Sequence, residues 1–412
     1  MKQQNATRTL LRLMMIAAIF LSVFLIARTS AHAASPTYKI KVNTKKCVTT
    51  VYQKVDGKWK PIRCMYCAPG KPSTPTPLGT YTLKGRWPWY HMTGPDYNVQ
   101  VRYAIQVHGD YFMHSCCYSS IDKTKESKPN FNGLGHGKTH GCIRFSVMDA
   151  KWIYENCEAG TEVTFYRSDK TGPLGKPEKK LKMTTKSSRG WDPTDPDKKN
   201  PSFKMKGATF TISDKKLKEM KCGKTGKNAD LMYGVTAVNP YANQDLTDQI
   251  KIQSLTLNGK KIKPSKYSTK TPGKYKVTYY VRDKYCTQEG KDGKTKSFTF
   301  KIMDKTSIKI KNPKRTVHKG DVNAVKGVRV TARSGDRTKD LRIKIVTPSG
   351  KTKRGSYNKA KNFIFRKAGD YKITYSIQNA YPKKTVKKTI TIRSLEEEPA
   401  DTAETSDSES AA

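Results

Sequence analysis

Two copies of one alternating segment, 96 residues apart, constrain how the C-terminal half of this chain can fold. Residues 271–281 read TPGKYKVTYYV, and residues 367–377 read KAGDYKITYSI. After a glycine, every second position is aromatic or β-branched, which is the pattern of a β-strand with one buried face. A second alternating run follows each copy, at 298–302 and at 389–392. We therefore predict repeated β-sheet domains in this half of the chain.

The repeat predicts two immunoglobulin-like β-sandwiches, at residues 202–303 and 304–393. A unit of about 100 residues, with short strands and turn signals between them, is typical of that fold. The Gly-x-Tyr-x-Val-x-Tyr pattern also resembles the late strands of bacterial immunoglobulin-like surface domains. Two interpretations of the tyrosine stripe remain open. The alternation favours packing inside each sandwich, and the alternative is a sugar-stacking face.

The heptapeptide THGCIRF, at residues 139–145, holds the groups that a thiol nucleophile needs. A cysteine requires a base, backbone N–H groups for the developing oxyanion, and a cation for an anionic substrate. Cys142 follows a histidine and a glycine, and Arg144 can hold a carboxylate with two hydrogen bonds. Gly141 allows a tight turn and a close approach of the substrate.

This run resembles the signature of the L,D-transpeptidase catalytic domain, which cross-links bacterial peptidoglycan. Further matches occur in the expected order, and together they cover roughly residues 37–167. They are TPLGTY at 76–81, FMHS at 112–115, DAKWIY at 149–154 and GTEV at 160–163. The resemblance implies a mainly β domain with one or a few short helices. It requires no metal and no cofactor.

The resemblance also implies a role for each residue of the site. Cys142 is the nucleophile, His114 is the base, and the carbonyl of Ser115 orients that histidine. His140 and Gly141 line or supply the oxyanion hole together with Cys142. Thr139 and Arg144 bind substrate, or Arg144 holds the loop. For His140, simple packing beside the nucleophile is an equally open interpretation.

The spacing of the site departs from the family pattern, because 28 residues separate His114 from Cys142. Residues 122–132 read as an inserted polar loop. A rival base then exists, His136, which lies six residues before Cys142. We favour His114, because a return from strand to strand needs more chain than six residues provide.

The remaining pattern of the first domain is also β-rich, with short alternating runs between Gly and Pro residues. Residues 146–157 form the one convincing helix, with Ser146 as its N-cap. Residues 168–201 are rich in Lys, Pro, Gly, Ser and Asp and read as an extended cationic linker.

The N-terminal segment predicts export. Residues 1–33 combine a basic start, a short apolar run and an Ala-x-Ala site, which is the pattern of a secretory signal peptide. An uncleaved membrane anchor is the lesser alternative. We therefore expect a secreted, extracytoplasmic protein that is associated with the cell wall and touches the membrane only through this segment.

Charge and cysteine content agree with that location. The formal net charge of +46 favours polyanions, and the expected partners are peptidoglycan stem peptides and anionic cell-wall polymers, not nucleic acid. Residues 395–412 form an acidic tail that we expect to be disordered. The nine cysteines predict disulfides plus one free thiol, Cys142, and the pair Cys64 and Cys67 is expected to be structural.

The leading hypothesis is an L,D-transpeptidase that forms 3→3 cross-links through a thioacyl-enzyme and releases D-alanine from a stem tetrapeptide. Two alternatives stay open at this stage. An L,D-carboxypeptidase would resolve the same intermediate with water, and a non-catalytic wall-binding or adhesive protein would use only the basic repeats.

Overall fold

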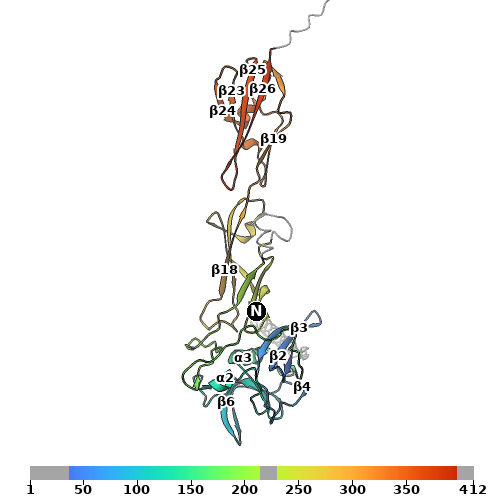
Figure 1. Ribbon diagram of the computed structural model, residues 1–412, viewed down its shortest axis with the longest axis vertical. Coiled ribbons are helices and arrows are strands. Elements are labelled where there is room, and N and C mark those ends of the chain that lie inside the picture. The colour runs from blue at the N-terminus through green and yellow to red at the C-terminus, as the bar shows by residue number, and fades with distance from the viewer. Residues whose placement is uncertain (1–36, 214–229, 397–412) are drawn as a thin grey trace, which may run out of the picture. The chain divides into compact units, whose positions relative to one another are not determined.

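The structure is a computed structural model that describes residues 37–213 and 230–396 (Figure 1). The predicted signal peptide, Cys222 and most of the acidic tail lie outside these ranges. Strands dominate the described chain, and the predicted mainly β fold is confirmed. Within those ranges, no helix has the length and apolar character needed to cross a membrane. The α-helices are α2 Lys128–Asn132, α3 Val147–Asn156 and α5 Tyr357–Lys361.

The N-terminal unit contains two sheets that share one core. The first has the strand order β3-β2-β1-β10-β4, and the second has the order β5-β6-β7-β9. Alternate residues of both sheets point into the core, together with Trp152 and Ile153 of α3. The strands of the first sheet are β1 Tyr38–Asn43, β2 Val48–Val55, β3 Lys58–Tyr66, β4 Gly79–Thr82 and β10 Glu162–Tyr166. Those of the second are β5 Arg86–Gly94, β6 Tyr97–His108, β7 Tyr111–Ser115 and β9 Ile143–Phe145.

Helix α3 begins where the sequence predicted it. Ser146 is the N-cap, and its hydroxyl accepts a hydrogen bond from the N–H of Asp149 at 3.3 Å. Two further N–H groups of the first turn are bound from outside the helix. Val147 donates to the carboxylate of Asp192 at 2.7 Å, and Met148 donates to the hydroxyl of Thr194 at 3.1 Å. An anion at this position also complements the helix dipole.

Residues 168–201 differ from the extended linker that we predicted. In the structure, Asp192, Thr194, Asp195 and Asn200 of this segment are buried against the N-terminal unit. The Asp195 carboxylate accepts a hydrogen bond from the equally buried guanidinium of Arg102 at 2.5 Å. The composition of the segment was misleading, because two of its acids are buried: Asp195 neutralises Arg102, and Asp192 accepts a hydrogen bond from the first turn of α3.

The boundary of the first predicted sandwich also shifts. Val238–Asp248 and Arg282–Lys294 pack with residues 37–209 as one compact unit. Tyr241 and Tyr285 of these segments enter the core between the two sheets, and the Tyr285 hydroxyl donates to the Glu155 carboxylate at 2.9 Å. Sequence periodicity identifies strands, but it does not show which core a connecting loop joins.

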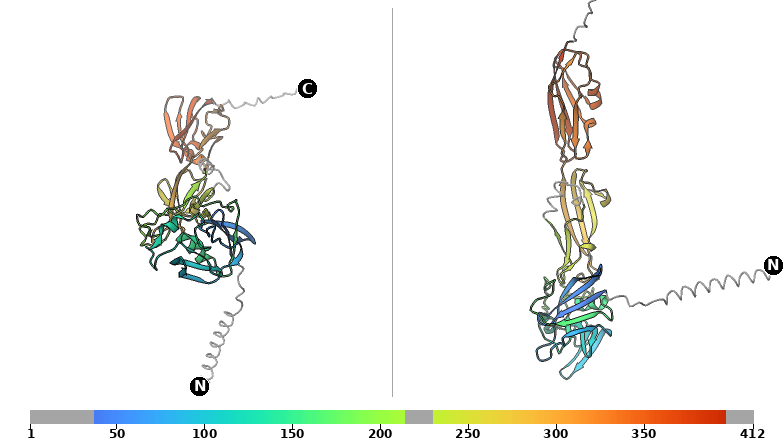
Figure 2. Two further views of the ribbon diagram at one scale, coloured as in Figure 1. Left: turned by 60° about the horizontal axis from the view of Figure 1, so that its bottom comes forward. Right: turned by 90° about the vertical axis from the view of Figure 1, so that its right-hand side faces the viewer.

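The C-terminal unit contains most of the two repeats, and Figure 2 gives two further views of the chain. In the first repeat the strands β16-β15-β17-β18 form one sheet, and β12-β13-β14 form a short sheet whose strand β14 belongs to the N-terminal unit. In the second repeat the sheets are β19-β21-β22 and β20-β26-β25-β23-β24. The bounds in the first repeat are β12 Thr209–Ile212, β13 Val235–Asn239, β14 Gln244–Asp245, β15 Lys251–Leu257, β16 Lys260–Ile262, β17 Gly273–Val281 and β18 Lys294–Ile302. In the second they are β19 Ser307–Ile310, β20 Thr316–His318, β21 Val328–Ala332, β22 Gly335–Asp336, β23 Arg342–Val346, β24 Thr352–Ser356, β25 Gly369–Gln378 and β26 Thr385–Leu395.

The repeated tyrosines lie inside these domains. Tyr275 and Tyr279 of β17 are buried, as are Tyr371 and Tyr375 of β25. In the two repeats, the hydroxyl groups donate hydrogen bonds to backbone carbonyls at corresponding positions. Tyr275 and Tyr371 each donate at 3.0 Å to the carbonyl four residues earlier in the chain. The buried stripe packs the core, so these tyrosines do not form a sugar-stacking face.

The buried Arg102–Asp195 pair predicts a large effect of one isosteric change. Asp195→Asn would leave the guanidinium without its counter-charge, so we expect the free energy of unfolding to fall by about 3–5 kcal/mol. The matched control is Asp197→Asn, two residues away, where the carboxylate pairs with the partly exposed Lys123 at 2.6 Å. That change should cost at most about 1 kcal/mol. Urea denaturation of the whole chain measures both, and equal effects would contradict the structural role of residues 168–201.

Candidate active site

Cys142 lies just before β9, which pairs in parallel with β7. Its side chain is partly exposed. The backbone N–H of Phe112 donates to Sγ at 3.4 Å, and the thiol lies 3.7 Å from the carbonyl of Asp110. On the other side, Cys142 packs against an apolar cluster on the outer face of the second sheet. That cluster contains Val101, Ala104, Phe112 and Cys117, with Trp87, Tyr90, Met92 and Val99 at its edge.

The register of the two strands places His114 on the same face as the cysteine. His114 is paired with Arg144, and Met113 is paired with Ile143. Paired residues of parallel strands point to the same side, and side chains two positions apart share a face. His114, Arg144 and Cys142 therefore share one face of the sheet, while Met113 and Ile143 enter the core.

One hydrogen bond determines the proton position on His114. Its Nδ1 lies 2.5 Å from the carbonyl oxygen of Ser115. A carbonyl oxygen only accepts hydrogen bonds, so Nδ1 carries the proton and Nε2 of the neutral ring has the free lone pair. This geometry makes Nε2 the basic atom.

Burial favours the uncharged forms of both Cys142 and His114. Burial, with Arg144 as the second cause, lowers the pKa of His114 to about 3. Burial also raises the pKa of the Cys142 thiol, and the Phe112 N–H opposes that shift only in part. Both shifts favour a neutral thiol beside a neutral imidazole at neutral pH, because burial disfavours the charged form of each group.

The loop before Cys142 is fixed by two threonine hydroxyls. Thr139 accepts a hydrogen bond from the N–H of Gly141 at 3.0 Å and donates to the carbonyl of Cys142 at 2.6 Å. Thr76 donates to the carbonyl of Gly141 at 2.7 Å. At Gly141, φ is +122°, and a Cβ there would lie 2.4 Å from the ring of Tyr111. Only glycine fits this turn.

Arg144 holds a neighbouring segment in place. Its guanidinium donates to the side-chain oxygen of Asn130 at 2.7 Å. Asn130 belongs to α2, within the segment that we predicted to be an inserted polar loop. This segment is anchored in turn by residues of the former linker, since Asn132 exchanges hydrogen bonds with Met183 and β8 Glu126–Ser127 pairs with β11 Arg189–Gly190.

The other histidines near the motif lie at the surface. His140 is exposed and stacks on Tyr97, with 5.2 Å between ring centroids. His136 is also exposed and lies in a turn closed by its N–H to the carbonyl of Gly133. His108 stacks on Tyr81. The structure thus brings together Cys142, His114, Ser115, Gly141, Thr139 and Arg144, and it places His140 at the rim.

Sequence reasoning missed several supporting groups. The Phe112 N–H that contacts the sulfur and the Tyr111 ring beside Gly141 have no signal of their own in the sequence. Thr76 was part of the TPLGTY match, but its bond to the catalytic loop was not foreseen. Asp192 and Asp195 could have been noticed as acids in an otherwise basic stretch.

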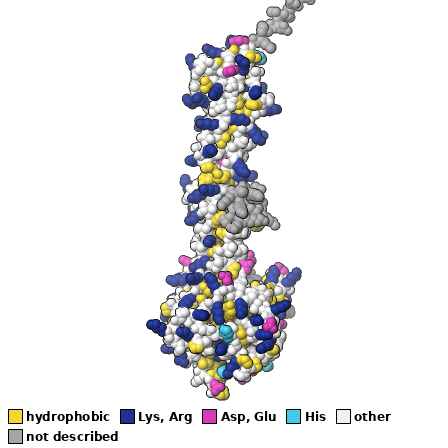
Figure 3. Space-filling model, in the orientation of Figure 1, with side chains coloured by type: hydrophobic (Ala, Val, Ile, Leu, Met, Phe, Trp, Pro, Cys, Tyr) yellow, Lys and Arg dark blue, Asp and Glu magenta, His cyan; other side chains and the backbone are white. Residues whose placement is uncertain are grey.

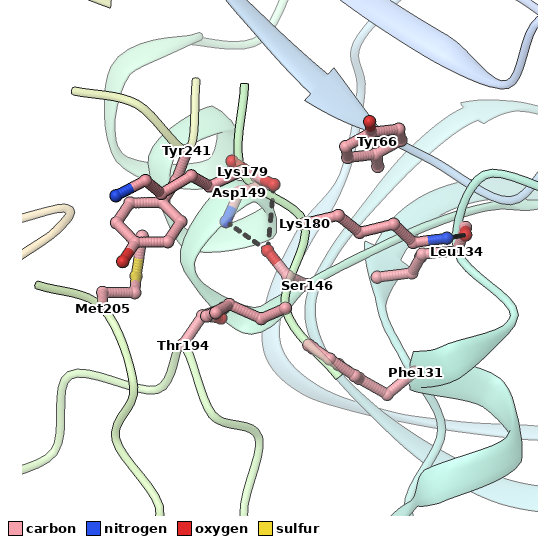
Figure 4. A pocket seen from close by; sticks show the side chains of 11 residues that line it. Tyr66, Phe131, Leu134, Ser146, Asp149, Lys179, Lys180, Thr194, Met205 and Tyr241 are labelled. Atoms are coloured by element: carbon pink, nitrogen blue, oxygen red, sulfur yellow. Dashed lines mark hydrogen bonds between the residues drawn. The ribbon is translucent and has the colours of Figure 1, made fainter. Parts of the chain in front are cut away.

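A separate pocket lies near the start of α3 (Figure 4). Ser146 and Asp149 are joined there by the N-cap hydrogen bonds, and the Lys180 ammonium donates to the carbonyl of Leu134. Neither Cys142 nor His114 lines this pocket. Across residues 37–213 and 230–396, no group of three or more His, Cys, Asp or Glu side chains is arranged to hold a metal ion.

Comparison with known proteins finds relatives of the N-terminal region. Residues 37–165 match the L,D-transpeptidase catalytic domain family. The predicted family resemblance is confirmed. A curated relative, YciB of Bacillus subtilis (strain 168), is named as an L,D-transpeptidase; it is 33% identical over 92 residues, or 21% of this chain and 45% of the relative.

Solved L,D-transpeptidases are also similar to this region. The enzyme from Mycobacterium smegmatis is 25% identical with a TM-score of 0.27, and covers 32% of this chain and 59% of its own. One from Mycobacterium tuberculosis H37Rv is 24% identical with a TM-score of 0.27 and the same coverage. The chain therefore spans less than two thirds of the length of each of these proteins.

The low pKa of His114 predicts a pH-dependent stability. In the unfolded chain a histidine titrates near ~6.5, so as pH falls the unfolded state takes up the proton first and the folded state loses stability. Between pH 7 and pH 5 this contribution should remove about 2 kcal/mol from the free energy of unfolding. The variant His114→Gln should not show this loss of stability, because it has no imidazole to protonate.

The measurement is the difference in unfolding free energy between wild type and His114→Gln at the two pH values. Buried Asp192, whose pKa is raised to about 6, and buried Glu126, whose pKa is also raised, act in the opposite direction. Both carboxyls are present in both proteins, so their contributions cancel in the difference. A difference that does not change with pH would contradict the neutral buried imidazole.

Proposed function

We propose that this protein is an L,D-transpeptidase that joins peptidoglycan stem peptides through a thioacyl-enzyme on Cys142. The observation that supports the proposal is the β7–β9 register, from which His114 and Cys142 share one face of the sheet, with Nδ1 of His114 bound to the Ser115 carbonyl and Nε2 left as the basic atom. The family match over residues 37–165 supports the reaction class. Because peptidoglycan lies outside the cytoplasm, the protein would act as a secreted, wall-associated enzyme.

In the acylation step, Sγ of Cys142 attacks the carbonyl carbon between the third and fourth residues of a donor stem. Nε2 of His114 receives the thiol proton as the S–C bond forms, since neither group is ionised at rest. That proton then passes to the departing amine of D-alanine as the peptide bond breaks. The product of this step is a thioester on Cys142.

The developing oxyanion needs a backbone N–H group that does not already donate a hydrogen bond within the protein. The N–H of Gly141 bonds to Thr139, so it serves the loop and not the substrate. We therefore assign the backbone N–H of Cys142 itself as the oxyanion donor, with Gly141 shaping the approach. This narrows the role that we expected for Gly141 and leaves His140 as a rim residue.

In the second step, an amine on the third residue of a neighbouring stem attacks the thioester. His114 accepts the amine proton and returns it to the sulfur of Cys142 as the thioester breaks. The product is a 3→3 cross-link, and the enzyme is restored. Arg144 acts by holding Asn130 and the segment that borders the site, and its contact with a substrate carboxylate is a secondary role.

Replacing the nucleophile should abolish the reaction. We expect Cys142→Ser to lower cross-linking by at least about 10³-fold, because a serine hydroxyl beside a neutral histidine is a far weaker nucleophile than a thiol. The control is Cys47→Ser, which makes the same change in the buried turn between β1 and β2 and should keep most of the activity. Mass spectrometry of muropeptides after incubation gives the readout.

The same spectra separate the alternatives. Cross-linked dimers support the transpeptidase, whereas shortened stems without dimers would identify a carboxypeptidase that uses the same intermediate. No change with wild type would leave only a wall-binding role. Activity retained in Cys142→Ser would contradict the assignment of the nucleophile.

A further inference from the structure

The outer face of the large sheet in the second repeat, β20-β26-β25-β23-β24, is lined by cations and hydroxyls. The inward residues of these strands, such as Ile343, Ile345 and Ile373, fill the core of the domain. Strand alternation sends the residues between them to the outside. The outward cations of four adjacent strands include Arg342, Lys344, Arg354, Lys372 and Lys387.

The strand register orders these side chains in rows. In one row, Ser376 is paired with both Arg342 and Lys387. In the next row, Lys344 is paired with both Arg354 and Thr374. Neighbouring strands are about 4.8 Å apart, and outward residues repeat about every 6.7 Å along a strand. The face is therefore a grid that contains both cations and hydroxyl groups: they alternate in the first row, and in the second row two cations lie beside two threonines.

A groove runs over this grid. Arg342, Lys344, Arg354, Lys359 and Lys387 line it together with Ser356, Thr374 and Ser376, and its lining contains no acidic residue. The other large groove of this domain differs, because Asp336 and Asp340 line it beside its cations. We call the first one the basic groove. On the face visible in Figure 3, Lys and Arg side chains are abundant over this domain and acidic side chains are sparse.

The cations of the basic groove are not neutralised by the domain itself. Within the described part of the chain, no carboxylate forms an ion pair with Arg342, Lys344, Arg354, Lys359 or Lys387. The one acidic residue on this face, Asp370, lies at the far end of β25 and pairs with Arg393 at 3.6 Å. Such uncompensated charge is destabilising for a fold, and an anionic ligand would offset it.

The first repeat carries the same motif on its equivalent strand. Lys276 and Thr278 of β17 occupy the positions of Lys372 and Thr374, 96 residues later. In both copies the threonine hydroxyl bonds a hydroxyl on the next strand, at 2.9 Å to Ser297 and at 3.0 Å to Thr389. The grid of cations and hydroxyls is thus part of the repeat.

We propose that the basic groove binds a linear polymer of phosphodiesters linked by short polyols, such as a poly(glycerol phosphate). Phosphate oxygens accept hydrogen bonds from Arg, Lys and hydroxyl groups alike, and a regular polymer can match a regular grid. The location of such a polymer at the cell wall rests on the function proposed above. The groove would hold the enzyme where its stem peptides are.

The composition of the groove disfavours two other polyanions. Single-stranded nucleic acid is held by aromatic side chains on which bases stack, and no aromatic side chain lines the basic groove. Binding in a membrane interface requires an apolar face beside the basic one. Here Ile343 is the one large apolar side chain that lines the groove, and it is buried; the other side chains beside the cations are serine and threonine.

The test uses the whole chain and two matched triple variants. One replaces Lys344, Lys359 and Lys387 of the basic groove with Gln. The control replaces Lys309, Lys311 and Lys314, which are exposed cations outside the basic groove, with Gln. Both lose three charges, and thermal unfolding verifies that both are folded. The probe is synthetic poly(glycerol phosphate), titrated over a series of salt concentrations.

We expect the groove variant to bind at least about tenfold more weakly and the slope of log K against log salt to decrease by roughly two, as the loss of three cation–phosphate contacts predicts. The control variant should stay within about twofold of wild type. Equal losses in the two variants would overturn the proposal, because net charge alone would then explain binding. The proposal would also be overturned if double-stranded DNA, or vesicles containing an anionic phospholipid, bound to the basic groove as tightly as poly(glycerol phosphate) or more tightly.

The outcome is separable from the proposed enzymatic function. Cys142→Ser should bind the polymer like wild type, and the groove variant should still form cross-linked dimers from soluble stems. A variant that loses polymer binding but keeps cross-linking activity tests only the proposed groove. A variant that loses cross-linking activity but still binds the polymer tests only the proposed active site.

Discussion

The parallel pairing of β7 with β9 is the constraint on which the candidate site depends. Its register opposes His114 to Arg144 and so sets the cysteine two residues earlier on the same face. A shift by one residue would turn His114 into the core and Met113 toward the thiol. The core resists that shift, since Met113, Ile143 and Phe145 are buried on the opposite face. Packing of apolar side chains thus fixes the geometry of the polar ones.

Successive contacts support this pairing from parts of the chain that are distant in sequence. Arg144 holds Asn130 of the inserted segment, and that segment is bound through Asn132 to Met183. A few residues later, Asp192 binds the first turn of α3 and Asp195 neutralises Arg102 of β6. The contacts that support the candidate site therefore extend beyond the family match at residues 37–165 and include the segment that follows it.

The sequence predicted the parts of this protein that have strict local patterns. The alternation around Tyr275 and Tyr371 identified β17 and β25 and the buried face of each strand, and Ser146 identified the start of α3. The family motifs predicted Cys142, His114 and Ser115 as site residues, and the register sets the first two on one face of the sheet. Contacts over long sequence distances were not predictable in this way, because nothing near Asp195 indicates that its partner is Arg102. The protonation of the pair was also missed, since it follows from burial that only the fold provides.

The central claim is that Cys142 and His114 meet as a neutral pair whose proton moves only during the reaction. The most direct measurement is the rate of Cys142 alkylation by iodoacetamide from pH 5 to pH 10, followed by peptide mass spectrometry to isolate this thiol. Our account predicts a slow rate near neutral pH that rises only at or above the ordinary thiol pKa of ~8.5. A fast rate that stays level down to about pH 5 would indicate a preformed thiolate–imidazolium pair and would contradict the account.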